Sequence, residues 1–419
     1  MARGERIDSH EEGERMKQLM IFTPLKVFTT LTVFTTLTVT AGSAMAMSDG
    51  EYVAKAADCV ACHTSSTGPD LAGGVRFATP LGDIFSTNIT PDVANGIGDY
   101  SYEDFEKAMR EGIAKDGHPL YPAMPYTSYA KMTSEDIRAL YDYLMNEVKP
   151  QPVANPENEI SWPLSIRWPL HVWNSMLLEK GEYVPLADQS AEWNRGAYLV
   201  QGAGHCGACH TPRGWAQQEK ALDDKDPVFL SGGELDGWSA PSLRGLNISQ
   251  PELVTLLKTG RNAKDAVSGP MGEVITHSMQ FMTDADLNNM AVYLLSLKAE
   301  EQKPAGKKAV ATPDGQQTFM RYCSTCHGVQ GDGNENTIPA LAGNMTVNAE
   351  NPQTLLRVIL DGGQTPVTAE HMSNTMPGYG WTLTDQQVAE LTNTLRASWG
   401  NHATAVTAED VAKARKAGK

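Results

Sequence analysis

The sequence Cys59-Val60-Ala61-Cys62-His63 has two counterparts along the chain, Cys206-Gly207-Ala208-Cys209-His210 and Cys323-Ser324-Thr325-Cys326-His327. These three C-x-x-C-H motifs use all six cysteines of the 419-residue chain. Two cysteines three residues apart on one turn can form thioether bonds to the two vinyl groups of one haem, and the adjacent histidine then lies below the iron as its proximal ligand. The motifs therefore predict three covalently bound haem c groups.

Other uses of a C-x-x-C pair fit this sequence less well. A structural zinc site joins two such pairs at close spacing, whereas these pairs lie far apart in the chain. A thioredoxin-like redox pair needs a βαβ context, which the pattern lacks. A structural disulfide would not require a histidine after every second cysteine.

The same order of elements repeats around each motif. A short amphipathic helix leads into C-x-x-C-H, a middle helix follows, and a methionine-containing loop precedes a last helix. We expect first helices at 51–57, 192–200 and 315–322, middle helices at 102–111, 251–258 and 352–360, and last helices at about 134–147, 284–298 and 385–398. The residues standing before the middle helices are Ser101, Gln250 and Asn351, of which only Gln250 is not a preferred cap. Each last helix begins with Thr-x-x-Asp or Thr-x-x-Gln, which is typical of a capping box.

Shorter matching segments also support duplication of one ancestral unit. Leu71-Ala72-Gly73-Gly74 matches Leu230-Ser231-Gly232-Gly233, and Pro241-x-Leu243-x-Gly245 matches Pro339-x-Leu341-x-Gly343. Pro69-x-Leu71-x-Gly73 also fits the second pattern, but it overlaps the first. We prefer the L-x-G-G alignment because it places the motif at a suitable sequence distance before the middle helix of the first unit.

The fold expected from these repeats is all-α, with three tandem class I-type cytochrome c domains joined by linkers and preceded by a signal peptide. Lys17, an apolar Thr-rich run and Ala44-Met45-Ala46 form a secretory signal with Met16 as the preferred start, so we expect a periplasmic protein; an uncleaved anchor is the alternative. The expected boundaries are 1–46 for leader and signal peptide, 47–150 for the first domain, 151–187 for a Trp- and Pro-rich connector, 188–300 for the second domain, 301–313 for a linker, 314–402 for the third domain and 403–419 for a polar tail that frays.

The formal net charge of −16 argues against a nucleic acid partner, and it suits either a basic protein partner or simple solubility.

Methionines supply the expected sixth iron ligands. Met124 and Met376 are each followed by proline, which favours an extended backbone in the loop that presents the sulfur. In the second unit we choose Met271 over Met279 from its place in the loop, and Met282 is expected to be a core residue. Histidines near these loops are the rival ligands: His118, His277 and His371. His205 precedes Cys206 directly and is expected to be too strained to bind the same iron as His210.

Aromatic residues are expected to close the haem pockets or to form plain core. They are Tyr52, Tyr198, Trp238, Tyr322 and Trp381. The tryptophans of the connector, Trp162, Trp168 and Trp173, are expected to pack against another domain or a partner.

With these units placed, the chain resembles the trihaem cytochrome c subunits of bacterial membrane-bound dehydrogenases, which include gluconate, sorbitol, fructose and alcohol dehydrogenases. The resemblance covers the whole mature chain and is most specific at Ser86–Pro91, Gly117–Tyr126, Gly269–Val274 and Met376–Trp381. The methionine ligands of that family match Met124, Met271 and Met376 here.

The resemblance implies a non-catalytic electron-transfer subunit at the cytoplasmic membrane. A separate large subunit containing FAD or PQQ would oxidise the substrate, and this chain would pass the electrons through its haems to membrane ubiquinone. Family members often attach to the membrane through a C-terminal amphipathic segment, but residues 402–419 have few large apolar side chains. The alternatives are a haem enzyme of the peroxidase type and a mobile carrier or cytochrome c subunit of a terminal oxidase. The substrate of the partner, the order of the haems and their potentials stay open.

Overall fold

The computed structural model describes residues 47–79, 81–299, 306–335 and 337–418, and all structural statements below concern these residues. The expected leader and signal peptide lies outside them, as do residues 301–305 of the linker expected at 301–313. Within the described part, no helix combines the length and the apolar character needed to cross a membrane.

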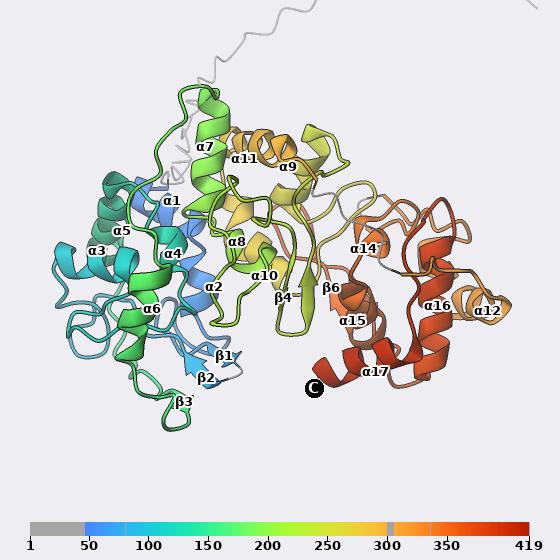
Figure 1. Cartoon of the computed structure of the whole chain (residues 1–419), viewed down its shortest axis with the longest axis horizontal. Coiled ribbons are helices and arrows are strands. Elements are labelled where there is room, and N and C mark those ends of the chain that lie inside the picture. Colours follow the sequence, from blue (N-terminus) through green and yellow to red (C-terminus); the bar gives the residue numbers. More distant parts are fainter. Residues whose placement is uncertain (1–46, 80, 300–305, 336, 419) are drawn as a thin grey trace, which may run out of the picture. The chain divides into compact units, whose positions relative to one another are not determined.

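Three helical units follow one another along the chain, as Figure 1 shows. We define them by their C-x-x-C-H motifs as the first, second and third unit. The helices of the first unit are α1 (Asp49–Ala56), α2 (Cys59–His63), α3 (Tyr102–Glu111), α4 (Tyr126–Tyr129) and α5 (Ser134–Asn146). Those of the second unit are α7 (Ala191–Gln201), α8 (Gly207–His210), α9 (Gln250–Thr259), α10 (Pro270–His277), the 3-10 turn η1 (Met279–Phe281) and α11 (Asp284–Ser296). Those of the third unit are α12 (Pro313–Tyr322), α13 (Ser324–His327), α14 (Met345–Asn348), α15 (Gln353–Asp361), α16 (Asp385–Ala397) and α17 (Ala408–Ala417).

The nine expected helices are confirmed, each with ends within two residues of the prediction. Ser101 caps α3 in a capping box with Asp104, as expected. The expectation for α9 was wrong in one respect: Ser249 is the cap and pairs with Glu252, whereas Gln250 lies inside the helix. The cap position of α15 is Pro352, and the side chain of Asn351 accepts a hydrogen bond from the backbone N–H of Gln353.

A glycine in each first helix lets the last helix of the same unit cross it closely. A Cβ atom on Gly50, Gly196 or Gly315 would lie 2.1, 2.0 or 2.3 Å from a backbone oxygen of α5, α11 or α16. No side chain fits at such distances. The crossing of first and last helix is therefore built in the same way three times.

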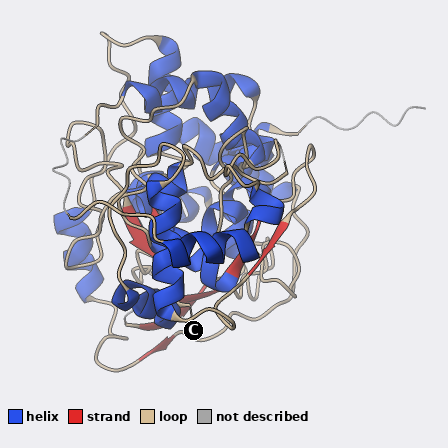
Figure 2. Ribbon diagram, turned by 90° about the vertical axis from the view of Figure 1, so that its right-hand side faces the viewer, coloured by secondary structure: helices blue, strands red, loops and turns tan. Residues whose placement is uncertain are grey.

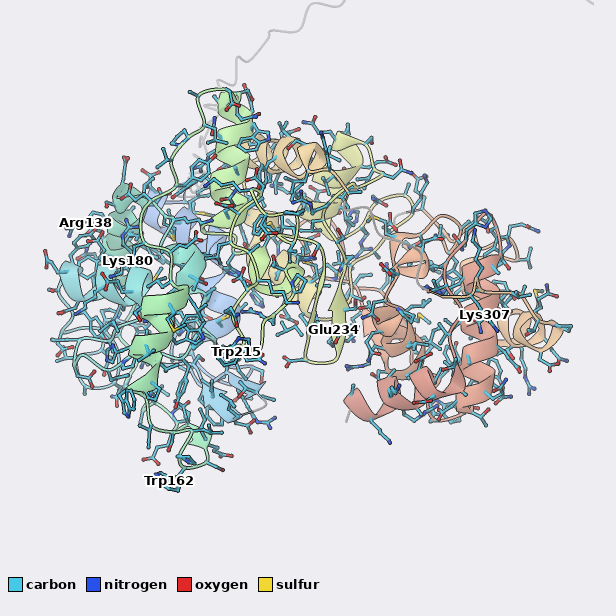
Figure 3. All side chains as sticks on the ribbon, viewed as in Figure 1. Arg138, Trp162, Lys180, Trp215, Glu234 and Lys307 are labelled. Atoms are coloured by element: carbon cyan, nitrogen blue, oxygen red, sulfur yellow. The ribbon has the colours of Figure 1, made fainter. Side chains whose placement is uncertain are left out.

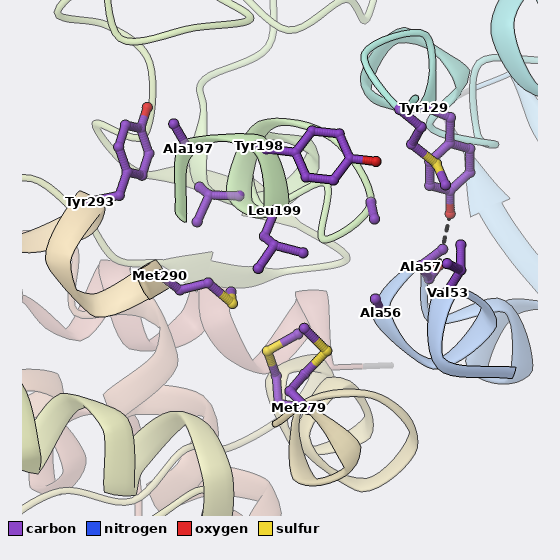
Figure 4. Close-up of a cluster of buried hydrophobic side chains, with 14 of the residues drawn as sticks. Val53, Ala56, Ala57, Tyr129, Ala197, Tyr198, Leu199, Met279, Met290 and Tyr293 are labelled. Atoms are coloured by element: carbon purple, nitrogen blue, oxygen red, sulfur yellow. Dashed lines mark hydrogen bonds between the residues drawn. The ribbon is translucent and has the colours of Figure 1, made fainter. Parts of the chain in front are cut away.

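The first and second units share one hydrophobic core, whereas the third unit has its own. Figure 4 shows part of the shared core, where Tyr198 and Leu199 of α7 lie near Met290 of α11 and Tyr129 donates a hydrogen bond to the carbonyl of Ala57 (2.8 Å). Two domains predicted to be consecutive are thus packed into one body.

Reciprocal hydrogen bonds join these first two units. The hydroxyl of Tyr52 on α1 donates to Asp286 of α11 (2.7 Å) and accepts from the backbone N–H of Thr283 (3.2 Å). In the opposite direction, the hydroxyl of Tyr198 on α7 donates to Asp136 of α5 and accepts from the N–H of Thr133 (3.1 Å). The same pair of groups is used on both sides, as in the two-fold interface of a homodimer.

The all-α expectation was incomplete, because the loops contain short antiparallel strands (Figure 2). They are β1 (Arg76–Thr79), β2 (Gly82–Phe85), β3 (Glu159–Ile160), β4 (Gly233–Leu235), β5 (Trp238–Ala240), β6 (Gly362–Gln364) and β7 (Thr375–Pro377). The hairpin β4–β5 turns at Asp236 and Gly237, both with positive φ (48° and 71°). Asp-Gly is a strong two-residue hairpin signal. The strands satisfy backbone groups of the long loops that surround each motif.

The tail does not fray, contrary to expectation. Residues 408–417 form α17, which packs on α15 and α16 and buries Val411 and Ala414 completely. Arg415 holds the helix in place through an ion pair with Asp385 (2.9 Å) and a hydrogen bond to the carbonyl of Leu383 (3.0 Å). The few apolar residues of the tail are used within the third unit.

Candidate haem-binding sites

Each C-x-x-C-H motif lies on a short helix directly after the first helix of its unit, on α2, α8 and α13. A sharp turn precedes the first two motifs, where Asp58 (φ 52°) and His205 (φ 36°) adopt the left-handed conformation. The ring of Tyr129 lies edge-on to that of His205 (5.7 Å between centroids), and its hydroxyl bonds the turn before Cys59. His205 therefore belongs to the contact between the two units.

The three motif histidines are held in the same way. Nδ1 of His63, His210 and His327 lies 2.6, 2.7 and 3.0 Å from the carbonyl oxygen of Thr87, Pro241 and Pro339. Because a carbonyl only accepts, Nδ1 must carry the proton, and Nε2 keeps its lone pair for a metal. Burial lowers the pKa of all three rings, although the bond to the carbonyl acts in the opposite sense, so the neutral, ligating form is favoured.

The loops that carry these carbonyls confirm the preferred alignment of the repeats. Leu71 and Leu230 both have a φ of 60°, and each donates its N–H to the threonine that follows the motif histidine. Their carbonyls accept from Ile89 and Leu243, two residues after Thr87 and Pro241. Pro69-x-Leu71-x-Gly73 is therefore not the counterpart of the proline motifs, and Thr87 takes the place of their proline.

Sequence reasoning did not find the three carbonyl partners. The shared Pro-x-Leu pattern around Pro241 and Pro339 was the available signal, but the first unit has Thr87-x-Ile89 instead. The stretch Ser86–Pro91 now has a local explanation: the buried Asn88 side chain donates to the carbonyls of Gln151 (2.8 Å) and Val153 (3.0 Å), which fixes the loop against the connector.

The cysteine pairs do not have the properties of redox-active dithiols. They are not disulfide-bonded. Burial raises the pKa of Cys59, Cys62 and Cys206 to about 12, and that of Cys209 and Cys323 to about 11. A catalytic thiol requires the opposite shift. These pairs are suited to being consumed in thioether bonds.

The third site contains a cavity of about 180 Å³. Its wall brings together Cys323, Cys326 and His327 of the motif with Met376 of β7, and the rest is mainly apolar. Met376 is extended and pairs with Gly363 in the β6–β7 ladder, in agreement with the effect expected from Pro377. Two thiols, an imidazole and a thioether around one apolar cavity fit a haem c group with His and Met ligands.

The other two candidate methionines are half-buried against the shared core, together with Cys59 and Cys206. Met124 follows Tyr121-Pro122 in a turn before α4, and Met271 lies in the first turn of α10. Met279 and Met282 are fully buried core residues, as was expected for Met282.

The rival histidines are engaged elsewhere or lie nearer the surface. Nδ1 of His118 lies 2.5 Å from Asp116, and Nε2 of His277 lies 3.2 Å from Glu273 on the same helix. His371 is half-buried, and its backbone N–H donates to the Thr368 hydroxyl (3.1 Å).

Of the aromatic residues expected at the pockets, Tyr322 lines the third cavity. Tyr52 and Tyr198 instead form the reciprocal contact between units. Trp238 lies under Gly269, directly before Pro270 and Met271, and Trp381 is 87% exposed, so its predicted role in closing a pocket was wrong.

Two carboxyl groups lie beside the first and second motifs. Burial raises the pKa of Asp58 to about 8, with Glu273 adding to the shift and Lys55 opposing it. Burial likewise raises the pKa of Glu219 to about 7, against the influence of Arg213 and Lys131. A Cβ atom on Gly207 would lie 2.4 Å from the Glu219 carboxylate, so this group is next to the second motif.

The three sites adjoin one another. Cys209 contributes to the raised pKa of Cys62, and α10 of the second unit packs on α2 of the first. Ala266, Val267 and Ser268, just before Met271, line the cavity of the third site. The methionine segment of the second unit therefore contacts both other sites.

Helical units with a carbonyl-bonded histidine after a buried C-x-x-C pair define a c-type cytochrome, a class that binds haem c covalently. In agreement, the family model for cytochrome c matches residues 47–147 and 313–399, which contain the first and third motifs. The chain is 46% identical over 401 residues to the cytochrome c subunit of alcohol dehydrogenase (quinone) from Gluconacetobacter polyoxogenes, which covers 90% of this chain and 86% of the relative. It is 45% identical to the gluconate 2-dehydrogenase cytochrome c subunit of Pantoea cypripedii (88% and 89% covered) and 36% identical to the fructose dehydrogenase cytochrome subunit of Gluconobacter japonicus (89% and 83%). The chain belongs to this family of dehydrogenase cytochrome c subunits.

Proposed function

We propose that the chain is a trihaem electron-transfer subunit with three tandem cytochrome c domains. The cysteines that attach the haems are Cys59, Cys62, Cys206, Cys209, Cys323 and Cys326. The proximal ligands are His63, His210 and His327, and the sixth ligands are Met124, Met271 and Met376. The observation that carries the proposal is the histidine–carbonyl bond, which recurs in all three units. In the first two units the loop that supplies the carbonyl also has the same geometry. This support includes the second unit, which the family model does not match.

A haem in each site would supply one-electron redox chemistry at its iron. The residues of this chain then have three tasks. The carbonyls of Thr87, Pro241 and Pro339 orient the imidazoles, the methionine loops close the sixth position, and the apolar walls keep water away. A chain built in this way carries electrons without catalytic residues of its own.

The contacts between sites support a relay in which the second site is the middle member. Its methionine segment reaches the third cavity at one end and packs on α2 of the first site at the other. Because electron transfer needs closely spaced cofactors, this order lets electrons cross the chain without a direct step between the first and third sites.

The relatives suggest the donor and the acceptor. They are named as subunits of alcohol, gluconate and fructose dehydrogenases, one of them a quinone enzyme. We propose that a large FAD- or PQQ-containing dehydrogenase subunit reduces this chain and that membrane ubiquinone oxidises it. This places the mature chain in the periplasm, after removal of the predicted signal peptide, and at the surface of the cytoplasmic membrane.

Intact mass spectrometry of the mature protein tests the haem count. We expect the polypeptide mass plus three haem groups, and the loss of one haem from each double variant Cys59→Ser/Cys62→Ser, Cys206→Ser/Cys209→Ser and Cys323→Ser/Cys326→Ser. A wild-type mass with fewer than three haems would contradict the proposal. Low-spin spectra at all sites are expected, and a site that reacts with peroxide would favour the haem-enzyme alternative.

A further inference from the structure

The connector between the first two units presents an apolar surface to the outside. Its residues from 161 to 178 run from β3 through α6 (Pro169–Leu177). Five of its large apolar side chains are strongly exposed: Trp162 (81%), Leu164 (51%), Trp168 (66%), Val172 (49%) and Met176 (73%). We name these five residues the connector face; Figure 3 labels Trp162.

On α6 the apolar side chains face outward, whereas a surface helix usually turns its apolar side chains inward. Trp168, Val172 and Met176 are four residues apart, so they form one stripe along the helix. In a helix that faces only water, such an outward stripe is polar. A contiguous exposed apolar surface indicates a binding site for a protein or a membrane.

The opposite side of α6 is firmly fixed to the first unit. The ring of Trp173 lies against that of Tyr126 (6.2 Å, edge to face), and Asn174 accepts from the Tyr126 hydroxyl and donates to the carbonyl of Glu111, both at 2.8 Å. The Trp173 indole N–H also donates to the carbonyl of Ala216 (3.0 Å) in the second unit. The stripe of Trp168, Val172 and Met176 is therefore held outward by the contacts of α6 with both units.

Charge distinguishes residues 161–178 of the connector from the rest of the chain. No carboxylate occurs between Ser161 and Leu178, and Arg167 is the only residue there with a permanent charge. The whole chain has a net charge of −16. An acidic protein is repelled by the anionic surface of a bacterial membrane, so the face that approaches it must lack carboxylates.

The composition of the face also favours lipid over water. Tryptophan is enriched at membrane–water interfaces, and leucine, valine and methionine can enter the boundary between headgroups and acyl chains. Arg167, whose guanidinium lies 4.6 Å from the Tyr121 ring, supplies a positive charge at the base of the face.

We propose that the connector face is a membrane-docking surface that inserts into the headgroup region of an anionic phospholipid bilayer. The proposal deepens the proposed function, because it gives the electron carrier its route to a quinone dissolved in the bilayer. The connector packs on the loop of Met124 through Tyr121 and Tyr126. Docking by this face therefore brings the first site towards the membrane.

Flotation of the purified haem-loaded chain with vesicles of phosphatidylethanolamine and phosphatidylglycerol tests the proposal. The test variant is Trp162→Ser/Trp168→Ser/Met176→Ser. The matched control, Trp381→Ser/Met372→Ser/Val310→Ser, removes three equally exposed apolar side chains of the third unit and its linker (87%, 84% and 69%). We expect the vesicle-bound fraction of the test variant to fall about tenfold or more, and that of the control to stay at the wild-type level.

Haem content and visible spectrum show in every sample that the protein is folded. A test variant that floats like the wild type overturns the proposal, and so does a wild type that does not bind vesicles. If the test variant still floats but no longer co-purifies with a dehydrogenase subunit, the face is a protein interface and the proposal is equally overturned. Oxidation of the reduced chain by a soluble ubiquinone in detergent is measured separately, because its failure would contradict the proposed function and leave the docking result intact.

Discussion

Each motif histidine depends on one backbone carbonyl for its orientation, and the motif alone does not reveal which. The cysteines and histidines could be predicted as haem-binding residues from the sequence, because their chemistry requires a fixed spacing. The carbonyl partners could not, because a backbone oxygen is presented by any residue type: Pro241 and Pro339 in two units, and Thr87 in the first.

Removal of the Met376 thioether should open one iron. We expect Met376→Ala to convert one of three haems from low-spin to high-spin and to make that haem bind carbon monoxide, because the cavity then offers water in place of sulfur. Visible and electron paramagnetic resonance spectra measure this change. The control Met372→Ala, with a side chain 84% exposed, should leave the spectra unchanged. Three low-spin haems in Met376→Ala would show that another residue is the ligand.

Glu219 should make the second haem sensitive to pH. Burial raises the pKa of its carboxyl to about 7. Above that pH the carboxylate is charged and favours ferric iron, so the midpoint potential of the second haem should fall as pH rises through 7, by at most about 59 mV per pH unit. Redox titration at several pH values measures this slope.

Matched variants distinguish titration of Glu219 from the effect of other carboxylates on the midpoint potential. Glu219→Gln should flatten the slope of one haem, whereas Glu135→Gln, an exposed carboxylate on α5, should not. An unchanged slope in Glu219→Gln would place the titrating group elsewhere, with Asp58 beside the first motif as the next candidate.

At the scale of helices and strands, the sequence was most informative where caps and apolar periodicity agree. The last helices begin at Thr133, Thr283 and Thr384, each of which accepts a hydrogen bond from the backbone three residues on, as expected. The helix α17 was missed because it buries only small residues and valine, which give a weak periodic signal. The β4–β5 hairpin could have been predicted from Asp236-Gly237.

The close crossing of α7 and α11 at Gly196 predicts how much an alanine there lowers the free energy of unfolding, compared with an alanine at an open helix position. Gly196→Ala places a Cβ atom 2.0 Å from the carbonyl oxygen of Asn289, so it should reduce the free energy of unfolding by roughly 2 kcal/mol. Asn288→Ala at an exposed position of α11 should change the free energy of unfolding by about 0.5 kcal/mol or less, because it removes no buried contact and alanine favours helix. Denaturant unfolding of the haem-loaded variants measures both. Equal stability of the two variants would contradict the close crossing.

At the scale of the whole chain, the pairing of the first two units could not be read from the sequence. It depends on which faces of four helices meet, and Tyr52, Tyr198 and their aspartate partners are far apart in the chain. The tryptophans of the connector were also ambiguous. Trp173 packs against another unit as expected, but Trp162 and Trp168 are exposed to solvent.

The carboxylate of Asp286 should stabilise the paired units at neutral pH and not in acid. Burial alone would raise its pKa, but hydrogen bonds from Arg195 and Tyr52 hold the pKa below the ordinary value. A depressed pKa contributes stability that is present above pH 4 and is lost as the pH falls through the folded-state value. Asp286→Asn should therefore reduce stability at pH 7 by roughly 2 kcal/mol and weaken the acid dependence.

Urea unfolding at pH 7 and below pH 4 measures this difference. Asp284→Asn is the control, since Asp284 lies on the same helix with a side chain 84% exposed and only a distant ion pair to Lys258 (3.4 Å). A variant of Asp286 no less stable than that of Asp284 would mean that the reciprocal contact contributes nothing.

The core shared by the first two units has a consequence for how the protein matures. The shared cluster runs from Val53 to Leu297, so it cannot be complete until the chain up to Leu297 has emerged. If haem is attached as proposed, the machinery that joins it to Cys59 and Cys62 meets a chain whose shared core is still incomplete, and it must serve two attachment sites before the first two units close on each other. The third unit, with an interior of its own, can be completed or replaced by evolution as a separate module.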